Sequence, residues 1–309
     1  MKKKPHITIG VTAFNEGPYL ENALKSVLNQ NCKDWEGVLI LDGGYNKSTK
    51  LFFDKFNHHK FKKYNFPKNQ GPALTRAKAI ELCDTDWYYH LDGDDLLPED
   101  SIKLIVKAIN DNPKAQYIFG NCEHFSKNNS SIRKPIKDIE KLCFGPLFNA
   151  TAPIKKDLFY DLGGYDSNEN VQIHFDWDFW ITVLEKKNIG FQINKTLYKR
   201  RNRLNNYGNL KIHEAQASIE YLINKHSKYF FNKIRRDKAR YNVFEKLARH
   251  YKAQGKRNRA YYFAKKAIKI GPIHEGLKNI FKEEKMSLLR YLIRRFSRRF
   301  FIFKKEYFK

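Results

Sequence analysis

The sequence predicts an α/β fold, with a Rossmann-like, mixed but mainly parallel sheet flanked by helices, followed by an all-α C-terminal extension. Short apolar, β-rich runs alternate with helical patterns over the first two thirds of the 309 residues, which is typical of βαβ units. From about residue 206 onward only helical patterns remain. Hydrophobic residues make up 41% and charged residues 30% of the chain, a balance that excludes collagen-like and disordered proteins.

The N-terminal elements follow from hydrophobic periodicity. They are, in order, a strand over 7–11, an amphipathic helix over 19–29, a strand over 37–41, a weaker strand near 61–66, a helix over 73–82 and a strand over 87–91. Polar clusters come directly after three of these strands, at Thr12 to Glu16, at Asp42-Gly43-Gly44 and at Asp92 to Asp95. Because ligands bind at the carboxyl edge of open α/β sheets, we expect a binding site there.

The middle of the chain carries fewer signals. Residues 123–145 are polar around Ser126 to Ser131, and we interpret them as a mobile loop. An amphipathic helix is predicted to open near His174 and to run through Leu184. The G-x-G-x-x-G pattern of dinucleotide-binding proteins does not follow the first strand, and no P-loop lysine motif is present, so those two classes of nucleotide site are excluded.

Charge is distributed unevenly between two parts of the chain. Residues 1–198 carry 27 Lys and Arg against 25 Asp and Glu, whereas residues 199–309 carry 32 against 8, out of a net charge of +26. Within the basic part, residues 247–272 show the small and large residue spacing of one tetratricopeptide unit. We therefore predict a catalytic domain over 1–205, a helical domain over 206–284 and a basic amphipathic helix over 285–309.

Four candidate functional features each have a structural alternative. The acidic turn Asp92 to Asp95 could hold a divalent cation, or could be a solvated turn that caps the next helix. Asp42 could accept hydrogen bonds from a base or ribose, or could be a turn residue beside two glycines. Arg76 could bind phosphate, or lie on the surface of its helix. Asp176 could be a general base, or the N-cap of the helix that begins there.

The order of these motifs resembles the family-2 glycosyltransferases of the GT-A fold over roughly residues 6–203. The motifs that carry the resemblance are Thr12-Ala13-Phe14-Asn15-Glu16, Asp42-Gly43-Gly44-Tyr45, Gly71 to Arg76, Asp92-Gly93-Asp94-Asp95-Leu96-Leu97-Pro98, Gly163-Gly164-Tyr165-Asp166 and Phe175-Asp176-Trp177-Asp178. Each motif is weak alone, but six in order at similar spacing form a specific pattern.

The resemblance implies transfer of a sugar from a nucleotide diphosphate donor to an acceptor hydroxyl, with inversion at the anomeric carbon. It implies Asp176 as the general base, with Asp178 as the fallback. It implies Mg²⁺ or Mn²⁺ as cofactor, bound by Asp92, Asp94 and Asp95. The residues that it implies for nucleotide-sugar binding are Thr12, Phe14, Glu16, Asp42, Arg76 and Asp92.

Two departures from the family pattern concern the site. Phe175 stands where relatives have an acidic residue before the base. The sequence Arg200-Arg201-Asn202-Arg203 stands where many relatives have Y-R-x-H, whose histidine approaches the metal or the diphosphate. Arg203 is therefore a further candidate for nucleotide-sugar binding, because its guanidinium could stabilise diphosphate charge directly and reduce the need for a metal.

The basic C-terminal residues suggest a partner. Apolar residues from Leu289 to Tyr307 recur at helical spacing among arginines and lysines, a pattern typical of a helix that lies in the interface of an anionic membrane. No apolar run reaches the roughly 20 residues needed to span a bilayer, and no signal-peptide cleavage site follows Met1 to Lys4. We expect a cytoplasmic enzyme, peripheral on the inner membrane face, that uses a glycan or lipid-linked acceptor in surface polysaccharide or glycolipid assembly.

Three alternative functions stay open from sequence. The basic region could bind nucleic acid, although no recognition motif supports this. The chain could be a nucleotidyltransferase on a related fold, although the glycine-rich basic loop of that class is missing. It could also be a non-catalytic scaffold, against which the carboxylates at positions 42, 92, 94 and 176 argue.

Overall fold

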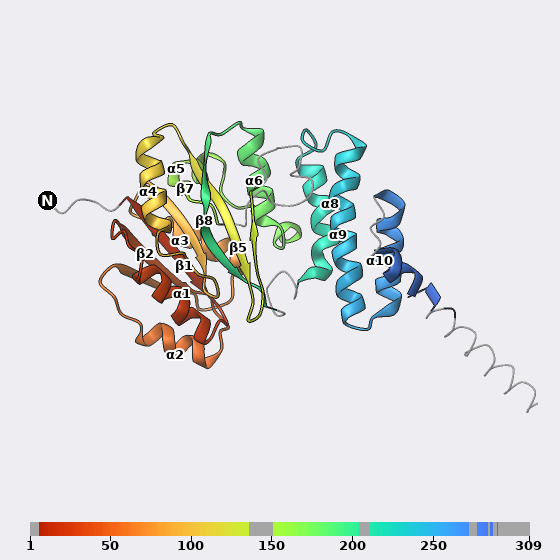
Figure 1. Cartoon of the computed structure of the whole chain (residues 1–309), viewed down its shortest axis with the longest axis horizontal. Helices are drawn as coiled ribbons and strands as arrows, with labels where there is room; N and C mark the ends of the chain where they lie inside the picture. The colour runs from red at the N-terminus through yellow and green to blue at the C-terminus, as the bar shows by residue number, and fades with distance from the viewer. Residues whose placement is uncertain are drawn as a thin grey trace, which may run out of the picture. The chain divides into compact units, whose positions relative to one another are not determined.

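The computed structural model describes residues 6–135, 151–203, 211–271, 277–283, 285, 286 and 289. The chain divides into two compact units (Figure 1), Met1–Leu142 with Pro146–Asn206, and Cys143–Gly145 with Tyr207–Lys309. The domain boundaries expected from the sequence stay predictions, and the basic helix expected over 285–309 lies almost wholly outside the described residues. Across the described ranges, none of the helices is both long enough and apolar enough to cross a membrane.

The first unit is built on one sheet. Its strands are β1 (Ile7–Ala13), β2 (Trp35–Leu41), β3 (Phe61–Asn65), β4 (Trp87–Asp92), β5 (Tyr117–Phe125), β6 (Ser130–Arg133), β7 (Ile154–Lys155) and β8 (Gly190–Arg201). They lie in the order β3-β2-β1-β4-β7-β5-β6, and β8 pairs with β5. Neighbouring strands from β3 to β4 are parallel, as are β5 and β8, while β7 and β6 run antiparallel to their partners. The mixed, mainly parallel sheet predicted from the sequence is confirmed.

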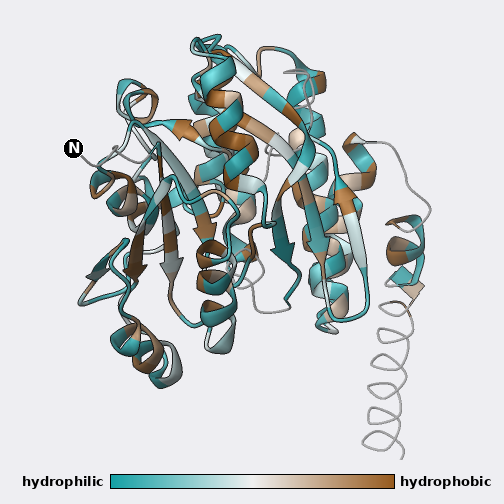
Figure 2. Ribbon diagram, turned by 60° about the vertical axis from the view of Figure 1, so that its left-hand side comes forward, coloured by the Kyte–Doolittle hydropathy of each residue, from teal (hydrophilic) through white to brown (hydrophobic). Residues whose placement is uncertain are grey.

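Helices cover this sheet in the manner of α/β proteins. They are α1 (Pro18–Leu28), α2 (Lys47–Lys55), α3 (Pro72–Glu81), α4 (Ser101–Asp111), α5 (Lys156–Asp161), the 3₁₀ helix η2 (Glu169–Val171) and α6 (Phe175–Glu185). The apolar face of α1 packs into the same core as β1, β2 and β4. Figure 2 shows hydrophobic residues along the strands and as stripes on the helices. The continuous apolar runs of the central strands are explained by their burial on both faces.

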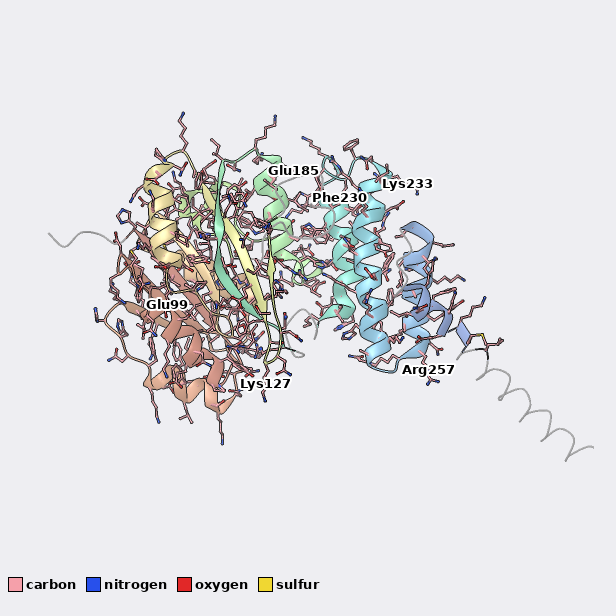
Figure 3. The ribbon with its side chains drawn as sticks, in the orientation of Figure 1. Glu99, Lys127, Glu185, Phe230, Lys233 and Arg257 are labelled. Carbon is pink, nitrogen blue, oxygen red and sulfur yellow. The ribbon has the colours of Figure 1, made fainter. Side chains whose placement is uncertain are left out.

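The structure differs from the sequence prediction in the middle of the chain. The segment interpreted as a loop from residue 123 contains the end of β5 and all of β6, which form an antiparallel hairpin (Figure 3 labels Lys127 in its turn). All four residues of β6 are exposed, so no apolar periodicity marks this strand. Residues 136–145 of the expected loop lie outside the described residues. Strand β8, also absent from the prediction, forms a parallel pair with β5.

The second unit is helical throughout its described residues. It contains the 3₁₀ helix η3 (Ile212–Glu214), α8 (Ala215–Lys225), α9 (Lys233–Ala253) and α10 (Arg257–Ile270). A further short helical segment covers residues 277–283. Gly255 turns the chain between α9 and α10 with a φ of +67°, where a glycine is favoured. Ala260, Ala264 and Ala267 are fully buried, which lets α10 approach α9 closely. The tetratricopeptide-like assignment of this helix pair stays a prediction.

Candidate active site

The parallel register of β1, β2 and β4 brings three polar segments to one edge of the sheet. Ala13 lies opposite Leu41, and Thr12 lies opposite Asp92. Two backbone hydrogen bonds continue this pairing past the strand ends, from Asp42 N–H to the carbonyl oxygen of Ala13 (2.7 Å) and from Gly93 N–H to that of Thr12 (2.8 Å). The residues that the sequence predicts to bind a nucleotide therefore gather at the carboxyl edge, where α/β sheets bind ligands.

Asp42 organises the loop that leads into α3. Its Oδ1 accepts from the Gln70 N–H (2.7 Å), and its Oδ2 accepts from the Gly71 N–H (3.0 Å) and from Nδ2 of Asn69 (3.1 Å). Burial raises the pKa of this carboxyl, and the backbone donors oppose the shift. The adjacent Gly43 lies so close to this loop that a Cβ at its position would be 2.3 Å from the Lys68 backbone, so only glycine fits there. Both the turn role and the edge position expected for Asp42 are thus present together.

Phe14 and Glu16 form a compact turn after β1. The N–H of Phe14 donates to Oε2 of Glu16. Burial raises the pKa of Glu16 to about 7, and Asp94 contributes in the same direction, while Arg203 opposes it. Glu16 is therefore a carboxyl that changes charge near neutral pH in a region already rich in acids.

Asp92, the last residue of β4, is held by two side chains from inside the fold. Nη2 of Arg76 donates to both of its carboxylate oxygens, at 2.7 and 2.9 Å, and Nε2 of His90 lies 2.7 Å from Oδ1. Although burial acts to raise the pKa of Asp92, Arg76 and His90 hold it well below its usual value. Burial and the nearby Arg76 lower the pKa of His90 to about 4. The neutral imidazole thus donates through Nε2 and accepts through Nδ1 from the Tyr88 hydroxyl (3.1 Å).

Arg76 is one of the most buried charged residues of the first unit, with 5% of its surface exposed. The alternative that it lies on the surface of its helix is therefore wrong. Its guanidinium lies 5.1 Å from the ring centroid of Phe175, which explains what the unusual phenylalanine before Asp176 contacts. Nε and Nη1 of Arg76 find no hydrogen-bond partner in the described part of the chain. The charge of Arg76 also acts on Asp176, so this residue connects β4 with α6 electrostatically.

Asp94 faces a different cation. Nε of Arg203 lies 2.6 Å from Oδ2 of Asp94, and the guanidinium lies 5.4 Å from the ring centroid of Tyr19. Burial and the neighbouring Asp92 raise the pKa of Asp94, and Arg203 lowers it. Gly93, between the two aspartates, lets the turn pass close to β1, because a Cβ there would lie 2.9 Å from the Thr12 carbonyl oxygen. Arg203, which the sequence predicts to bind the nucleotide sugar, thus lies at the acidic turn, and its role in binding stays a prediction.

Asp95, the third acid of the turn, is held by groups of β8. Its Oδ2 accepts from the Tyr198 hydroxyl (2.9 Å), and its Oδ1 accepts from the Arg201 N–H (2.6 Å). Both oxygens thus tie the turn to β8, and the role of Asp95 as a metal ligand stays a prediction. Among the residues that the structure describes, no group of three His, Cys, Asp or Glu side chains is arranged to hold a metal ion.

Asp176 lies in the first turn of α6, whose N-cap is His174, so the alternative that Asp176 is itself the N-cap is wrong. Its Oδ1 accepts from the Trp177 N–H (2.9 Å). Burial raises the pKa of Asp176, and Arg76 opposes this, which leaves a carboxylate more basic than usual and partly exposed. Asp178, in contrast, is 2% exposed and is a poorer candidate for contact with a substrate.

Sequence reasoning missed several residues that shape the site. Tyr88 and His90 are part of an apolar strand pattern. Only the alternation of their polar atoms with the buried Trp87, Tyr89 and Leu91 could have marked them. Tyr198 lies 103 residues from its partner Asp95, on a strand that was not predicted. Its hydroxyl also accepts from the Asp92 N–H (3.1 Å), so one side chain supports both aspartates.

Comparisons with known proteins agree with this geometry. The family model described as Glycosyl transferase family 2 matches residues 8–165. An uncharacterized glycosyltransferase of Methanocaldococcus jannaschii is 25% identical over 197 residues, which cover 59% of this chain and 65% of that protein. The chondroitin synthase of Escherichia coli is 22% identical over 204 residues, which cover 65% of this chain and 29% of the synthase. This chain thus spans less than two thirds of the length of either relative.

Two solved structures share the fold. The S. aureus TarS 1–349 fragment in complex with UDP-GlcNAc has a TM-score of 0.55 at 13% identity and covers 91% of this chain and 92% of its own. The mannosyltransferase PcManGT of Pyrobaculum calidifontis, in complex with GDP-Man and Mn²⁺, has a TM-score of 0.57 at 13% identity and covers 92% and 85%. Since the family model matches half of the chain and the predicted motifs meet at one sheet edge, the chain belongs to glycosyl transferase family 2.

Proposed function

We propose that this chain is an inverting glycosyltransferase that moves a sugar from a nucleoside diphosphate sugar to an acceptor hydroxyl. The observation that carries the proposal is the meeting of three groups at one sheet edge. These groups are the turn after β2 around Asp42, the acidic turn around Asp92 and Asp94, and α6 with Asp176, which is connected to Asp92 through Arg76. Such an arrangement offers, side by side, groups suited to bind a nucleoside, groups suited to bind a diphosphate, and a general base.

The donor would lie along the edge formed by β1, β2 and β4. Thr12, Phe14, Glu16 and Asp42 flank the ends of β1 and β2, where a base and ribose would bind. Arg76 and Arg203 each carry a guanidinium to the acidic turn, where diphosphate charge would grow as the sugar leaves. Guanidinium groups match phosphate oxygens in geometry and charge, so these two residues would bind the diphosphate.

Asp176 would act as the base in a single displacement. The acceptor hydroxyl gives its proton to the Asp176 carboxylate while its oxygen forms a bond to the anomeric carbon. The bond from that carbon to the diphosphate oxygen breaks, and the nucleoside diphosphate leaves with the electron pair. One displacement inverts the anomeric configuration. The raised pKa of Asp176 suits a group that must accept a proton near neutral pH.

The metal expected from the sequence stays a prediction. Mn²⁺ accompanies GDP-Man in the PcManGT structure, which supports a divalent cation at such sites in general. A divalent ion would neutralise charge on the leaving diphosphate. In this chain Arg76 and Arg203 compensate the charge of the acidic turn, the neutral His90 donates a hydrogen bond to Asp92, and none of the residue roles proposed above depends on a metal.

Surface polysaccharide or glycolipid assembly is the proposed pathway class. Two relatives support it by the activities that their names describe: chondroitin synthase, and the poly-beta-1,6-N-acetyl-D-glucosamine synthase of Staphylococcus epidermidis, which is 26% identical over 134 residues. We place the protein in the cytoplasm, peripheral on the inner membrane face, with residues 285–309 in contact with anionic lipid. The support for this placement is the sequence pattern of that segment.

The experiment that tests donor binding is a thermal-shift panel with UDP, GDP, dTDP and CMP. A ligand at about 100 times its dissociation constant stabilises the folded state by roughly 2.7 kcal/mol, which gives a visible shift. We expect a shift with one nucleoside diphosphate class, and a much smaller one in Asp42→Ala, which loses the loop contacts around Gln70 and Gly71. No shift with any nucleotide would contradict the proposal and favour the scaffold or nucleic-acid alternatives.

The membrane placement has its own test. Sedimentation with liposomes that contain phosphatidylglycerol is expected to carry down the full chain, and removal of residues 285–309 is expected to leave the protein in the supernatant with its nucleotide binding intact. Lipid binding that survives this truncation would remove the tail from the proposal.

A further inference from the structure

We propose that the turn between α8 and α9 inserts into an anionic lipid surface, with Phe231 and Ile234 in the interface between headgroups and acyl chains and the neighbouring lysines on lipid phosphates. We call residues 224–236 the basic tip. The inference goes beyond the proposed function, because it assigns a second lipid contact to the folded part of the helical unit, apart from residues 285–309. The tip supplements that segment, since stable anchoring to a membrane takes two signals.

The apolar part of the basic tip is the first observation. Phe231 and Ile234 are each 65% exposed, and no large hydrophobic side chain in the described part of the chain is more exposed. Phe231 directly precedes Asn232, the N-cap of α9. A residue in that place often packs on an apolar residue four positions into the helix, but that residue here is Arg236. An apolar pair left in water in this way is typical of a surface that binds an apolar partner.

The charge of the basic tip is the second observation. Residues 224–236 contain five Lys and Arg and no Asp or Glu. Lys225, Lys228 and Lys233 are exposed. Asp237, just beyond the tip, pairs with Lys233 at 2.6 Å and so offsets one of the five charges. Lysines can keep their charged ends at the headgroups while their stems lie along apolar surface, and anionic lipid attracts them. An apolar pair flanked by lysines therefore fits an anionic bilayer, whereas a nucleic acid would leave the apolar pair without a partner.

The backbone of the basic tip is the third observation. Nη1 of Arg235 donates to the carbonyl oxygen of Tyr229 (2.8 Å). Nη1 of Arg236 donates to the carbonyl oxygens of Phe230 (2.8 Å) and Phe231 (2.9 Å). Because a carbonyl group without a partner is costly away from water, these contacts reduce the cost of moving the turn into the lipid interface. They also hold the turn in one shape, with Phe231 exposed before any lipid is met.

The basic tip lies at one end of a helix pair. Figure 1 shows α8 and α9 side by side, joined by this turn at the top of the view, and Figure 3 labels Phe230 and Lys233 there. Helix α10 begins after the turn at the other end of α9, and the 21 residues of α9 separate its two ends by roughly 30 Å. A residue near the start of α10 therefore provides a reporter in the same unit that is far from the tip.

The test places a fluorescent reporter in the basic tip of the full chain. The chain has four tryptophans, all buried in the first unit: Trp35, Trp87, Trp177 and Trp180. Phe231→Trp adds an exposed one. With vesicles of phosphatidylglycerol and brominated phosphatidylcholine, we expect its emission to shift to shorter wavelength and to be quenched. Tyr262→Trp is the matched control, because Tyr262 is a half-exposed aromatic residue of α10, and its emission is expected to stay unchanged.

Removal of the apolar pair measures its share of the binding. Phe231→Ser combined with Ile234→Ser is expected to weaken partition of the full chain into these vesicles by about 5- to 50-fold, because two apolar side chains no longer enter the interface. Leu51→Ser removes a similarly exposed leucine (58%) from α2, and its partition should stay within about twofold of the unaltered protein. Thermal unfolding of both variants should match that of the unaltered protein, because the replaced side chains are exposed.

Three results would overturn the inference. Unchanged emission of Phe231→Trp while the protein sediments with the vesicles would leave lipid binding to residues 285–309 alone. Equal quenching in vesicles without phosphatidylglycerol would remove the role of charge. A response to single-stranded RNA and none to vesicles would make the basic tip a nucleic-acid surface. None of these results involves nucleotide binding, so the proposed transfer reaction is tested separately.

Discussion

Two ion pairs lie on the same acidic turn and differ in their surroundings. The inner pair, Arg76 with Asp92, is formed by a nearly buried guanidinium that bridges both carboxylate oxygens and is supported by His90. The rim pair, Arg203 with Asp94, is a single close contact whose guanidinium is more exposed than that of Arg76 (23% against 6%), although its carboxylate is less exposed than that of Asp92 (12% against 35%). The pKa of Asp92 lies well below its usual value, whereas burial and Asp92 raise that of Asp94.

The difference teaches that two aspartates of one motif, separated by a single glycine, perform different tasks. Asp92 is fixed by the fold, and its charge is required to balance a cation that water cannot reach. Asp94 is held by a cation that a ligand can reach, and its own charge is disfavoured by burial. We therefore expect the inner pair to maintain the structure of the site, and the rim pair to be where the proposed donor diphosphate contacts Arg203.

The largest expected effect comes from breaking the inner pair. Asp92→Asn removes the counter-charge of buried Arg76. Leaving one partner of a fully buried pair uncompensated costs about 3–5 kcal/mol, and because the Asp92 side chain is 35% exposed we expect a loss of about 2–3 kcal/mol. Denaturant unfolding followed by circular dichroism would measure this loss. A change below about 1 kcal/mol would mean that the inner pair does not hold the turn.

The second effect concerns Glu16, whose pKa is raised by burial from 4.5 to about 7. A carboxyl whose pKa is higher in the folded state contributes its full stabilisation at pH values below its pKa in the unfolded chain. That stabilisation is lost as pH rises from 4.5 to about 7, because the buried group must then ionise. We expect a loss on the order of 2 kcal/mol across this window, after allowance for partial exposure of the side chain. Unfolding midpoints between pH 4.5 and 8 would show it, and Glu16→Gln should flatten the profile. An identical pH profile in both proteins would contradict the assignment.

A smaller effect is expected from the rim pair. Asp94→Asn replaces a carboxylate whose ionised form is already disfavoured, so stability should change by less than about 1 kcal/mol. The same unfolding assay, run beside Asp92→Asn, compares two isosteric substitutions two residues apart. Equal losses in the two variants would remove the distinction between inner and rim pairs.

The smallest effect is expected at a surface pair that has no connection with the site. Lys107 and Asp111 pair at 2.5 Å on α4 with side chains that are 73% and 53% exposed. Lys107→Ala should change stability by less than about 0.5 kcal/mol, the usual range for exposed helical pairs. A loss as large as that of Asp92→Asn would show that the unfolding assay does not separate buried from exposed charge.

The sequence was sufficient for the elements with strong periodicity. The strands β1, β2 and β4 and the helices α1, α3 and α6 lie where apolar runs and amphipathic spacing predict them, with ends that differ by a few residues. The convergence of Asp42, Asp92 and Arg76 was also predictable, since parallel strands place their carboxyl ends at one edge.

The remaining elements leave weaker signals in sequence. All of β6 is exposed at the edge of the sheet, and β8 carries several exposed polar residues, so neither shows a continuous apolar run. Contacts between distant side chains could not be predicted from sequence either. Tyr198 donates to Asp95 from a strand that lies 103 residues further along the chain, and no local pattern encodes that contact. The expectation that Asp95 binds metal stays a prediction, and the partners that hold its carboxylate come from a strand that was not predicted.

The measurement that tests the central claim most directly is transfer by Asp176→Asn beside its binding of the donor. The variant keeps the shape of the side chain but cannot accept the acceptor proton, so release of nucleoside diphosphate in the presence of acceptor should fall by about 10²- to 10⁴-fold. Calorimetry should find donor affinity within about twofold of the unaltered protein. Asp178→Asn, as the comparison variant, should retain transfer. Full turnover by Asp176→Asn would contradict the account, because the base would then lie elsewhere.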